Sequence, residues 1–340
     1  MNELATSLTA SLDTTFSSSQ ISSDDRQIVY DFILSRLPQA GEPLALASAH
    51  HFEDSGKMLR ARMVMRGAYL LNVDYNAAIR WAAAIELLHN ASLVHDDICD
   101  GDKLRRGRQA VWAKFGRHVA LTLGDWLIAL SFELASEAAQ IAKTPKLVTL
   151  LARHMATTTA GEAMEFEFDR KNDWDTYLQI AADKTAPLLT APLQGVAIMA
   201  LDARAEIVVA SYFRYLGKAY QIANDIMNFD GKDGAKSVGS DLVRRAPNAV
   251  TLCFRDYLTT AEQAKFDQWY EAGDNSALLD WQAAIRKSNA MERAGRCMLS
   301  ILDDAETKAE SLSVEIYEVI SPVHALLKRV CLNSVKNLKV

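Results

Sequence analysis

The chain has 340 residues, of which 49% are hydrophobic and 24% charged, and it carries a formal net charge of −6. This composition allows a large buried core, and the negative balance argues against a general nucleic-acid-binding surface. The four cysteines stand far apart without a Cys-x-x-Cys pair, which excludes the common spacings of a zinc site or a disulfide framework and favours a reducing, cytoplasmic location.

The first segment of the chain is expected to lie outside the folded part. Residues 1–20 are rich in Ser and Thr and lack the basic and apolar regions of a signal peptide, so we predict a mobile N-terminal tail. Residues 21–340 contain no linker rich in Pro, Gly or Ser, so we predict one domain there. No run of about 18 apolar residues occurs, so no transmembrane segment is expected.

The hydrophobic pattern of this domain indicates helices almost throughout. Apolar residues recur at spacings of three and four, most clearly in 79–94 and 212–227, and alternating strand-like runs are scarce. Breaks fall in segments that contain Pro or Gly, such as 38–43, 101–107 and 231–239. We therefore predict an all-α fold, with many long helices in a single large bundle.

One predicted helix, residues 77–100, carries a polar stripe. The helix is apolar nearly all round and should be buried, yet His89, Ser92, Asp96 and Asp100 follow at steps of three, four and four and so share one face. Burying carboxylates costs free energy unless a cation lies among them, and oxygen ligands suit Mg²⁺. A solvated acidic helix end is the alternative, but acid is unfavourable at a helix C-terminus.

Basic residues flank this helix on both sides in the sequence. Lys103-Leu-Arg105-Arg106-Gly107-Arg108 follows it directly, and another basic cluster spans residues 57–66. Basic pockets within an acidic protein suit small anionic ligands. The arginines could simply neutralise the nearby carboxylates, or a metal and the arginines together could bind a diphosphate, whose oxygens match the guanidinium fork. Only the second interpretation predicts a cavity.

Five short motifs occur between Ser55 and Leu242 in a fixed order. They are Ser55-Gly56-Lys57-Met-Leu-Arg60, Asp96-Asp97-Ile-Cys-Asp100, Lys184-Thr185, Tyr220-Gln221 and Lys236-Ser-Val-Gly239-Ser-Asp241-Leu242. With these five motifs in this order, the chain resembles the trans-isoprenyl diphosphate synthases, the family of farnesyl and geranylgeranyl diphosphate synthases. The resemblance implies the class I isoprenoid synthase fold with a central active-site cavity, a homodimer, and two or three Mg²⁺ ions as cofactor.

The resemblance also implies roles for individual residues. The metal ligands would be Asp96, Asp97 and Asp100 with Asn224, Asp225 and Asn228. The diphosphate of the allylic substrate would contact Arg105, Lys184 and Lys236. The diphosphate of isopentenyl diphosphate would be bound by Lys57, Arg60, His89 and Arg106. The catalytic residues would be Lys184, Thr185 and Gln221, of which Thr185 and Gln221 would lie near the developing carbocation.

The second aspartate-rich motif departs from the family pattern. Where the family has Asp-Asp-x-x-Asp, this chain has Asn224-Asp225-Ile-Met-Asn228, so two carboxylates have become amides. An amide oxygen can still bind Mg²⁺ but carries no charge, so we expect a third metal ion to bind more weakly. The motif also partly resembles that of terpene cyclases, although Lys232 stands where those enzymes have Glu.

Three interpretations of the function therefore remain open. The first is a Mg²⁺-dependent prenyltransferase that condenses an allylic diphosphate head to tail with isopentenyl diphosphate. The second is a specialised relative that prenylates another acceptor or cyclises the chain, and the third is a non-catalytic partner subunit. By the family's rule for residues before the first motif, the small Ala91 favours a product of roughly C20 or longer.

Overall fold

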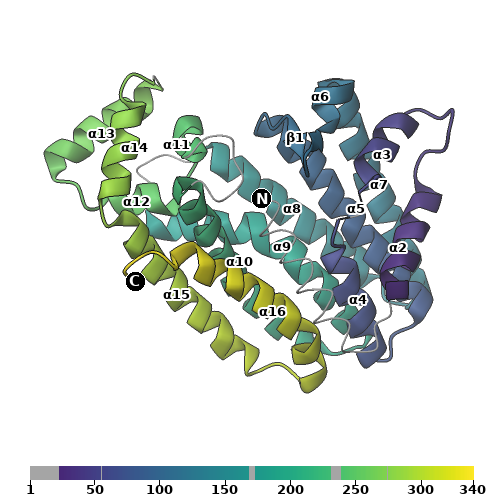
Figure 1. Cartoon of the computed structure of the whole chain (residues 1–340). Coiled ribbons are helices and arrows are strands. Elements are labelled where there is room, and N and C mark those ends of the chain that lie inside the picture. The colour runs from purple at the N-terminus through teal and green to yellow at the C-terminus, as the bar shows by residue number, and fades with distance from the viewer. Residues whose placement is uncertain (1–22, 55, 168–172, 231–238, 274) are drawn as a thin grey trace.

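The computed structural model describes residues 23–54, 56–167, 173–230, 239–273 and 275–340 (Figure 1). The prediction for residues 1–20 lies outside these ranges. The first helices are α2 (Ser23–Arg36), α3 (Ala45–Phe52), α4 (Leu59–Leu70), α5 (Tyr75–Cys99), α6 (Val111–Phe115) and α7 (Arg117–Ile141). The central pair is α8 (Lys146–Phe166) and α9 (Trp174–Met199). The remaining helices are α10 (Ala203–Asp230), α11 (Ser240–Arg244), α12 (Ala249–Arg255), α13 (Thr260–Ala272), α14 (Leu278–Lys287), α15 (Ala290–Ala309) and α16 (Val314–Val335).

Within the described ranges, strand pairing is limited to one short ribbon. It consists of β1 (Leu104–Arg105) and β2 (Arg108–Gln109), which pair antiparallel. The ribbon follows α5 and contains Arg105 and Arg108 of the basic run. The prediction of an all-α bundle is confirmed.

The helices form two groups joined by a central pair. In Figure 1, α2 to α7 lie on one side and α10 to α16 on the other, with α8 and α9 between them. α5 packs along α7, α9 packs against both α8 and α10, and α10 packs against α15. Two hydrophobic clusters fill these groups, and both draw residues from α4 and α9. The shared helices make one continuous body of the described chain.

The polar stripe lies on α5, which runs two residues further at its start than predicted. The helix begins after Asp74, whose side chain accepts a hydrogen bond from the Ala77 backbone N at 2.9 Å. Its middle is held against α9 by Trp81, whose indole Nε1 donates to the Pro192 carbonyl at 3.2 Å. A Cβ at Gly195 would lie 2.2 Å from this indole, so only glycine permits the close approach of the two helices.

One helix, α7, is long and apolar enough to cross a membrane by length and composition. In this structure 44% of its apolar window is buried within the protein, and it packs along α5. A core helix of a bundle meets the same length and composition criteria, so the finding carries no further conclusion.

Candidate functional site

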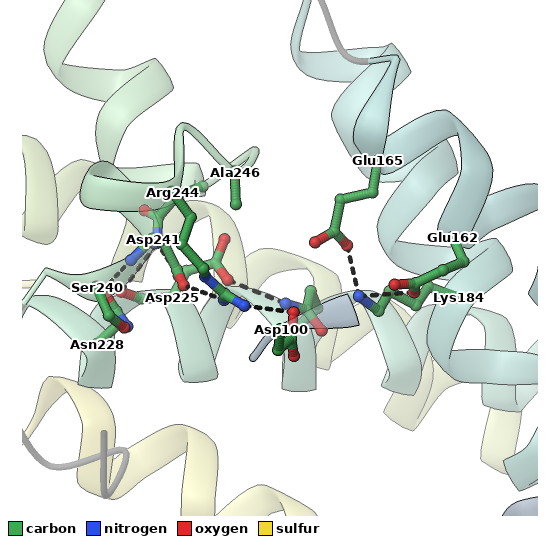
Figure 2. Close-up of polar contacts among 12 residues, drawn as sticks. Asp100, Glu162, Glu165, Lys184, Asp225, Asn228, Ser240, Asp241, Arg244 and Ala246 are labelled. Carbon is green, nitrogen blue, oxygen red and sulfur yellow. Dashed lines mark hydrogen bonds and ion pairs between the residues drawn. The ribbon is translucent and has the colours of Figure 1, made fainter. Parts of the chain in front are cut away.

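The three aspartates of the first motif have different surroundings at the end of α5. Asp97 is 2% exposed, and both of its oxygens accept from Arg105 Nε at 2.9 Å. Asp100 forms an ion pair with Arg244 of α11 (Figure 2). Asp96 makes no hydrogen bond or ion pair through its side chain in the part of the chain that the structure describes. Its oxygens are therefore available to a ligand.

The environment of Asp96 is strongly negative. Burial, together with the nearby charges of Glu162 and Asp100, raises the pKa of this carboxyl to about 7 against the opposing effect of Lys184. Carboxylate oxygens of Asp96 and Asp100, one turn apart on α5, are donors that fit Mg²⁺. Within the described ranges, no group of three or more His, Cys, Asp or Glu side chains converges on one metal position.

Lys184 faces this carboxylate cluster from α9. Its Nζ lies 2.8 Å from Glu162 and 2.7 Å from Glu165, both on α8 (Figure 2). Burial lowers the pKa of Lys184, but the two glutamates outweigh this effect and raise it above the ordinary value. The sequence prediction missed both glutamates. A signal was present in Gly161, because a Cβ there would lie 2.7 Å from the Lys184 backbone N and keep the two helices apart.

A second set of cations lies next to β1 and β2. A depression there is lined by His50, His51, Asp54, Asp97, Arg105, Arg106, Arg108, Gln109, Ala110 and Val111. Arg106 Nη1 donates to the Asp54 carbonyl at 2.8 Å, and its guanidinium lies over Gly56, where an added Cβ would be 2.6 Å from Nη2. Gly56 of the Ser55–Arg60 motif thus makes room for Arg106 of the basic run.

Arg60 reaches this region through an unusual acceptor. Its Nε donates to the Leu188 carbonyl in the middle of α9 at 2.9 Å. The residue four positions on is Pro192, which has no N–H to donate to that carbonyl. Beside Arg60, the buried Glu86 accepts from the Ala61 backbone N at 2.9 Å, and burial raises the pKa of this carboxyl.

Two imidazoles near these arginines are held neutral. Burial lowers the pKa of His89 well below its ordinary value, and the charges of Arg60 and Arg106 lower it further. Burial also lowers the pKa of His51 to about 4, although its Nε2 lies 3.0 Å from Asn90 Oδ1. His51 was not predicted as a site residue. Burial also lowers the pKa of Lys57. The two neutral imidazoles give this region hydrogen-bonding groups beside the charged guanidinium groups.

The second motif, across the cavity on α10, is occupied by protein donors. Asp225 is 2% exposed and accepts from Tyr177 Oη at 2.6 Å, Gln221 Nε2 at 3.0 Å and the Ala249 backbone N at 2.7 Å. Burial and the charge of Asp241 raise its pKa well above the ordinary value. This hydrogen bond orients Gln221, whose oxygen accepts from Thr185 Oγ1 at 3.4 Å. Tyr177 was not predicted as a site residue.

The two amides of the second motif are also engaged. Asn228 Nδ2 donates to Ser240 Oγ at 2.8 Å, and its oxygen accepts from the Asp241 backbone N at 3.4 Å. Asn224 forms a side-chain hydrogen bond with Tyr220. Two predicted motif residues, Ser55 and Lys236, lie outside the described residues. The resemblance places Lys236 at the allylic diphosphate.

Comparison with known proteins shows where this arrangement belongs. The family model for polyprenyl synthetase matches residues 42–287. The chain belongs to the polyprenyl synthetase family. The match begins before Ser55 and ends after Leu242, so it is wider than the stretch over which the motifs were recognised.

Individual members of the family align over most of their length. The chain is 30% identical over 290 residues to heptaprenyl diphosphate synthase component 2 of Geobacillus stearothermophilus, covering 83% of this chain and 88% of the relative. It is 33% identical over 241 residues to geranylgeranyl pyrophosphate synthase of Geoglobus acetivorans, covering 69% and 75%. Decaprenyl diphosphate synthase from Rhodobacter capsulatus has the same fold, with a TM-score of 0.80 at 24% identity, covering 91% of this chain and 97% of that one.

A further solved structure carries ligands. Polyprenyl synthase from Caulobacter crescentus, complexed with calcium and isoprenyl diphosphate, superposes with a TM-score of 0.78 at 24% identity, covering 95% of this chain and 97% of that one. The predicted class I isoprenoid synthase fold is confirmed.

Proposed function

We propose that this chain is a Mg²⁺-dependent prenyltransferase that condenses an allylic diphosphate head to tail with isopentenyl diphosphate. The observation that supports this best is the presence of two cation sets that meet at Arg105. One set consists of Lys184 and Arg105, whose charges act on Asp96. The other consists of Arg60 and Arg106 together with Arg105, and their charges act on His89. Two anionic substrates held side by side need two such sets.

Asp96 and Asp100 would hold Mg²⁺ beside the allylic diphosphate, and Asp97 would fix the position of Arg105. Bound Mg²⁺ would neutralise the charge that develops on the diphosphate as the allylic C–O bond breaks. Lys184 and Arg105 add fixed positive charge to the same leaving group. Asn224, Asp225 and Asn228 would bind a metal ion only after giving up the protein partners that their polar atoms have in this structure.

The acceptor half of the reaction would use the second cation set. Arg60, Arg106 and Lys57 would bind the diphosphate of isopentenyl diphosphate, and the neutral His89 and His51 would donate hydrogen bonds without adding charge. Gln221, oriented by Asp225, and Thr185 would place oxygen dipoles near the carbocation, whose charge they stabilise. The small, fully buried Ala91 supports a product of roughly C20 or longer.

One set of incubations tests this function. Purified protein and Mg²⁺ are given dimethylallyl, geranyl, farnesyl or geranylgeranyl diphosphate, each with and without isopentenyl diphosphate, and the products are identified by mass spectrometry. Longer diphosphates that form only with isopentenyl diphosphate support elongation. Hydrocarbons or alcohols formed without it would replace our proposal with cyclisation, and no product in any mixture would refute it for the isolated chain.

We also propose a cytoplasmic homodimer in which residues 21–340 act as one domain. The four cysteines are all free, which fits a reducing compartment. Apolar side chains remain exposed on α7 and α8, including Leu121 at 46%, Met164 at 38% and Phe166 at 63%, and a dimer would bury them. Because one relative is named component 2, a second, different subunit is the competing arrangement. A dimer mass by light scattering, together with activity of the purified chain alone, supports the homodimer.

A further inference from the structure

Arg244 connects the first aspartate-rich motif on α5 with α11, which follows the second motif. It is the last residue of the short helix α11, and its guanidinium forms ion pairs with Asp100 of the first motif and with Asp241 Oδ1, the latter at 2.9 Å (Figure 2). Asp100 and Arg244 are 144 positions apart in the sequence. The side chain is 39% exposed, so a ligand can reach it.

The carboxylates around Arg244 on the second-motif side have no free oxygen. Asp225 accepts from Tyr177, Gln221 and Ala249, whereas Asp241 accepts from Arg244 through one oxygen and from Asn248 Nδ2 at 3.0 Å through the other. The two remaining side chains of the motif are uncharged amides. This side therefore offers poor ligands to a metal ion, whereas among the described residues the guanidinium of Arg244 brings positive charge next to Asp100.

The backbone presents Arg244 rigidly. α11 lies between Gly239 and Arg245, which have positive φ values of 69° and 61°. Arg245 is fixed in turn, because its guanidinium lies 4.0 Å from the centre of the Trp269 ring and its Nη1 donates to the Leu242 carbonyl at 2.5 Å. The Ala246 backbone N closes the turn on the Asp241 carbonyl at 2.9 Å. Arg244 thus extends from a fixed point toward Asp100.

We infer that Arg244 binds the diphosphate of the allylic substrate from the second-motif side, where it supplies the positive charge that a carboxylate-bound metal ion would otherwise bring. This inference rests on the proposed function and adds a residue to it. When Asp100 binds Mg²⁺, Arg244 loses one carboxylate partner and keeps Asp241. The released N–H groups then face the space beside Asp100 and donate to phosphate oxygens.

Two binding measurements on Arg244→Gln test this exchange by calorimetry. Mg²⁺ alone should bind the variant more tightly than wild type, because the competitor for Asp100 has been removed. Inorganic pyrophosphate at saturating Mg²⁺ should bind about 10- to 100-fold more weakly, the loss expected for hydrogen bonds to a charged group. Arg244→Lys should recover part of the pyrophosphate affinity, since it restores charge without the fork.

Arg36→Gln is the matched control. Arg36 also pairs with two carboxylates, Glu133 at 2.6 Å and Glu137 at 2.7 Å, but on α7 away from the cavity. The affinities of Arg36→Gln for Mg²⁺ and for pyrophosphate should both equal those of wild type. Thermal unfolding of all variants without ligand checks that the fold is retained.

The outcomes separate this inference from the proposed function. If Arg244→Gln binds pyrophosphate as tightly as Arg36→Gln does, while wild type elongates prenyl chains, Arg244 only shields Asp100 and our inference is overturned. If the wild-type protein makes no diphosphate with a lengthened prenyl chain, the proposed function fails. A selective loss of pyrophosphate affinity in Arg244→Gln would still support the contact between Arg244 and the diphosphate. Tighter Mg²⁺ binding combined with weaker pyrophosphate binding is the pair of results we expect.

Discussion

On the α5 side of the cavity, the carboxylate of Asp96 faces other carboxylates and has a pKa raised to about 7 by burial and by those charges. On the α10 side, the carboxylate of Asp225 accepts hydrogen bonds from three protein donors. Both belong to aspartate-rich motifs and both lie on long helices. The difference shows that a carboxylate is available to bind a ligand only where the surrounding elements contribute no hydrogen-bond donors to it. For Asp225 these donors come from α9, α12 and its own helix.

The comparison predicts the largest loss of activity at Asp96. Asp96→Ala should lower turnover by at least about 10²- to 10³-fold, the cost of removing one group that stabilises transition-state charge, and added Mg²⁺ should not restore it. Initial rates at several Mg²⁺ concentrations measure this. Asp125→Ala, at a side chain that is 77% exposed on α7, is the control. Near-normal activity of Asp96→Ala would remove the distinction between the two sides.

At Asp225 the main effect should fall on stability. Asp225→Ala leaves the Tyr177 hydroxyl and the Ala249 N–H buried without an acceptor, and each such group costs about 1–3 kcal/mol. We expect the free energy of unfolding to fall by about 3–5 kcal/mol in urea titrations. Tyr177→Phe removes a single donor and should cost less. Unchanged stability together with a strongly raised Mg²⁺ requirement would instead make Asp225 a metal ligand.

The buried His51 in the pocket beside β1 and β2 should make the free energy of unfolding depend on pH. Its pKa is about 4 in the folded protein and about 6.5 in an unfolded chain. Between these values the unfolded state binds more protons, so the free energy of unfolding falls as the pH is lowered through this window. His51→Gln should lose less stability between pH 7 and pH 4 than wild type, by up to about 3 kcal/mol. Parallel curves for the two proteins in urea would show that His51 is not held neutral.

The smallest effect is expected when charge is returned to the second motif. Asn224→Asp combined with Asn228→Asp should lower the Mg²⁺ concentration needed for half-maximal rate severalfold, because ligand charge raises cation affinity. The gain is limited because Asn228 already bonds Ser240 and the Asp241 backbone. The same Mg²⁺ dependence in the double variant and wild type would contradict the view that amides weaken this site.

Local sequence patterns were sufficient for part of this structure. The three- and four-residue spacing predicted a helix over 77–100, and the structure has α5 at Tyr75–Cys99. Glu162, Glu165 and Arg244 were missed because their roles arise from contacts between elements. Lys184 meets Glu165 across 19 positions, and Arg244 meets Asp100 across 144. Helical periodicity describes the faces of one helix and contains no information on which other helix supplies a partner.

Pro192 has a consequence for how the acceptor pocket can evolve. The missing N–H of this residue leaves the Leu188 carbonyl to Arg60. Any other residue at this position would bring an N–H that competes for the same oxygen, so a substitution that improves the regularity of α9 would release Arg60 from its anchor. The orientation of the guanidinium that we propose binds substrate is thus linked to a backbone defect on another helix, and selection on one of these positions acts on both.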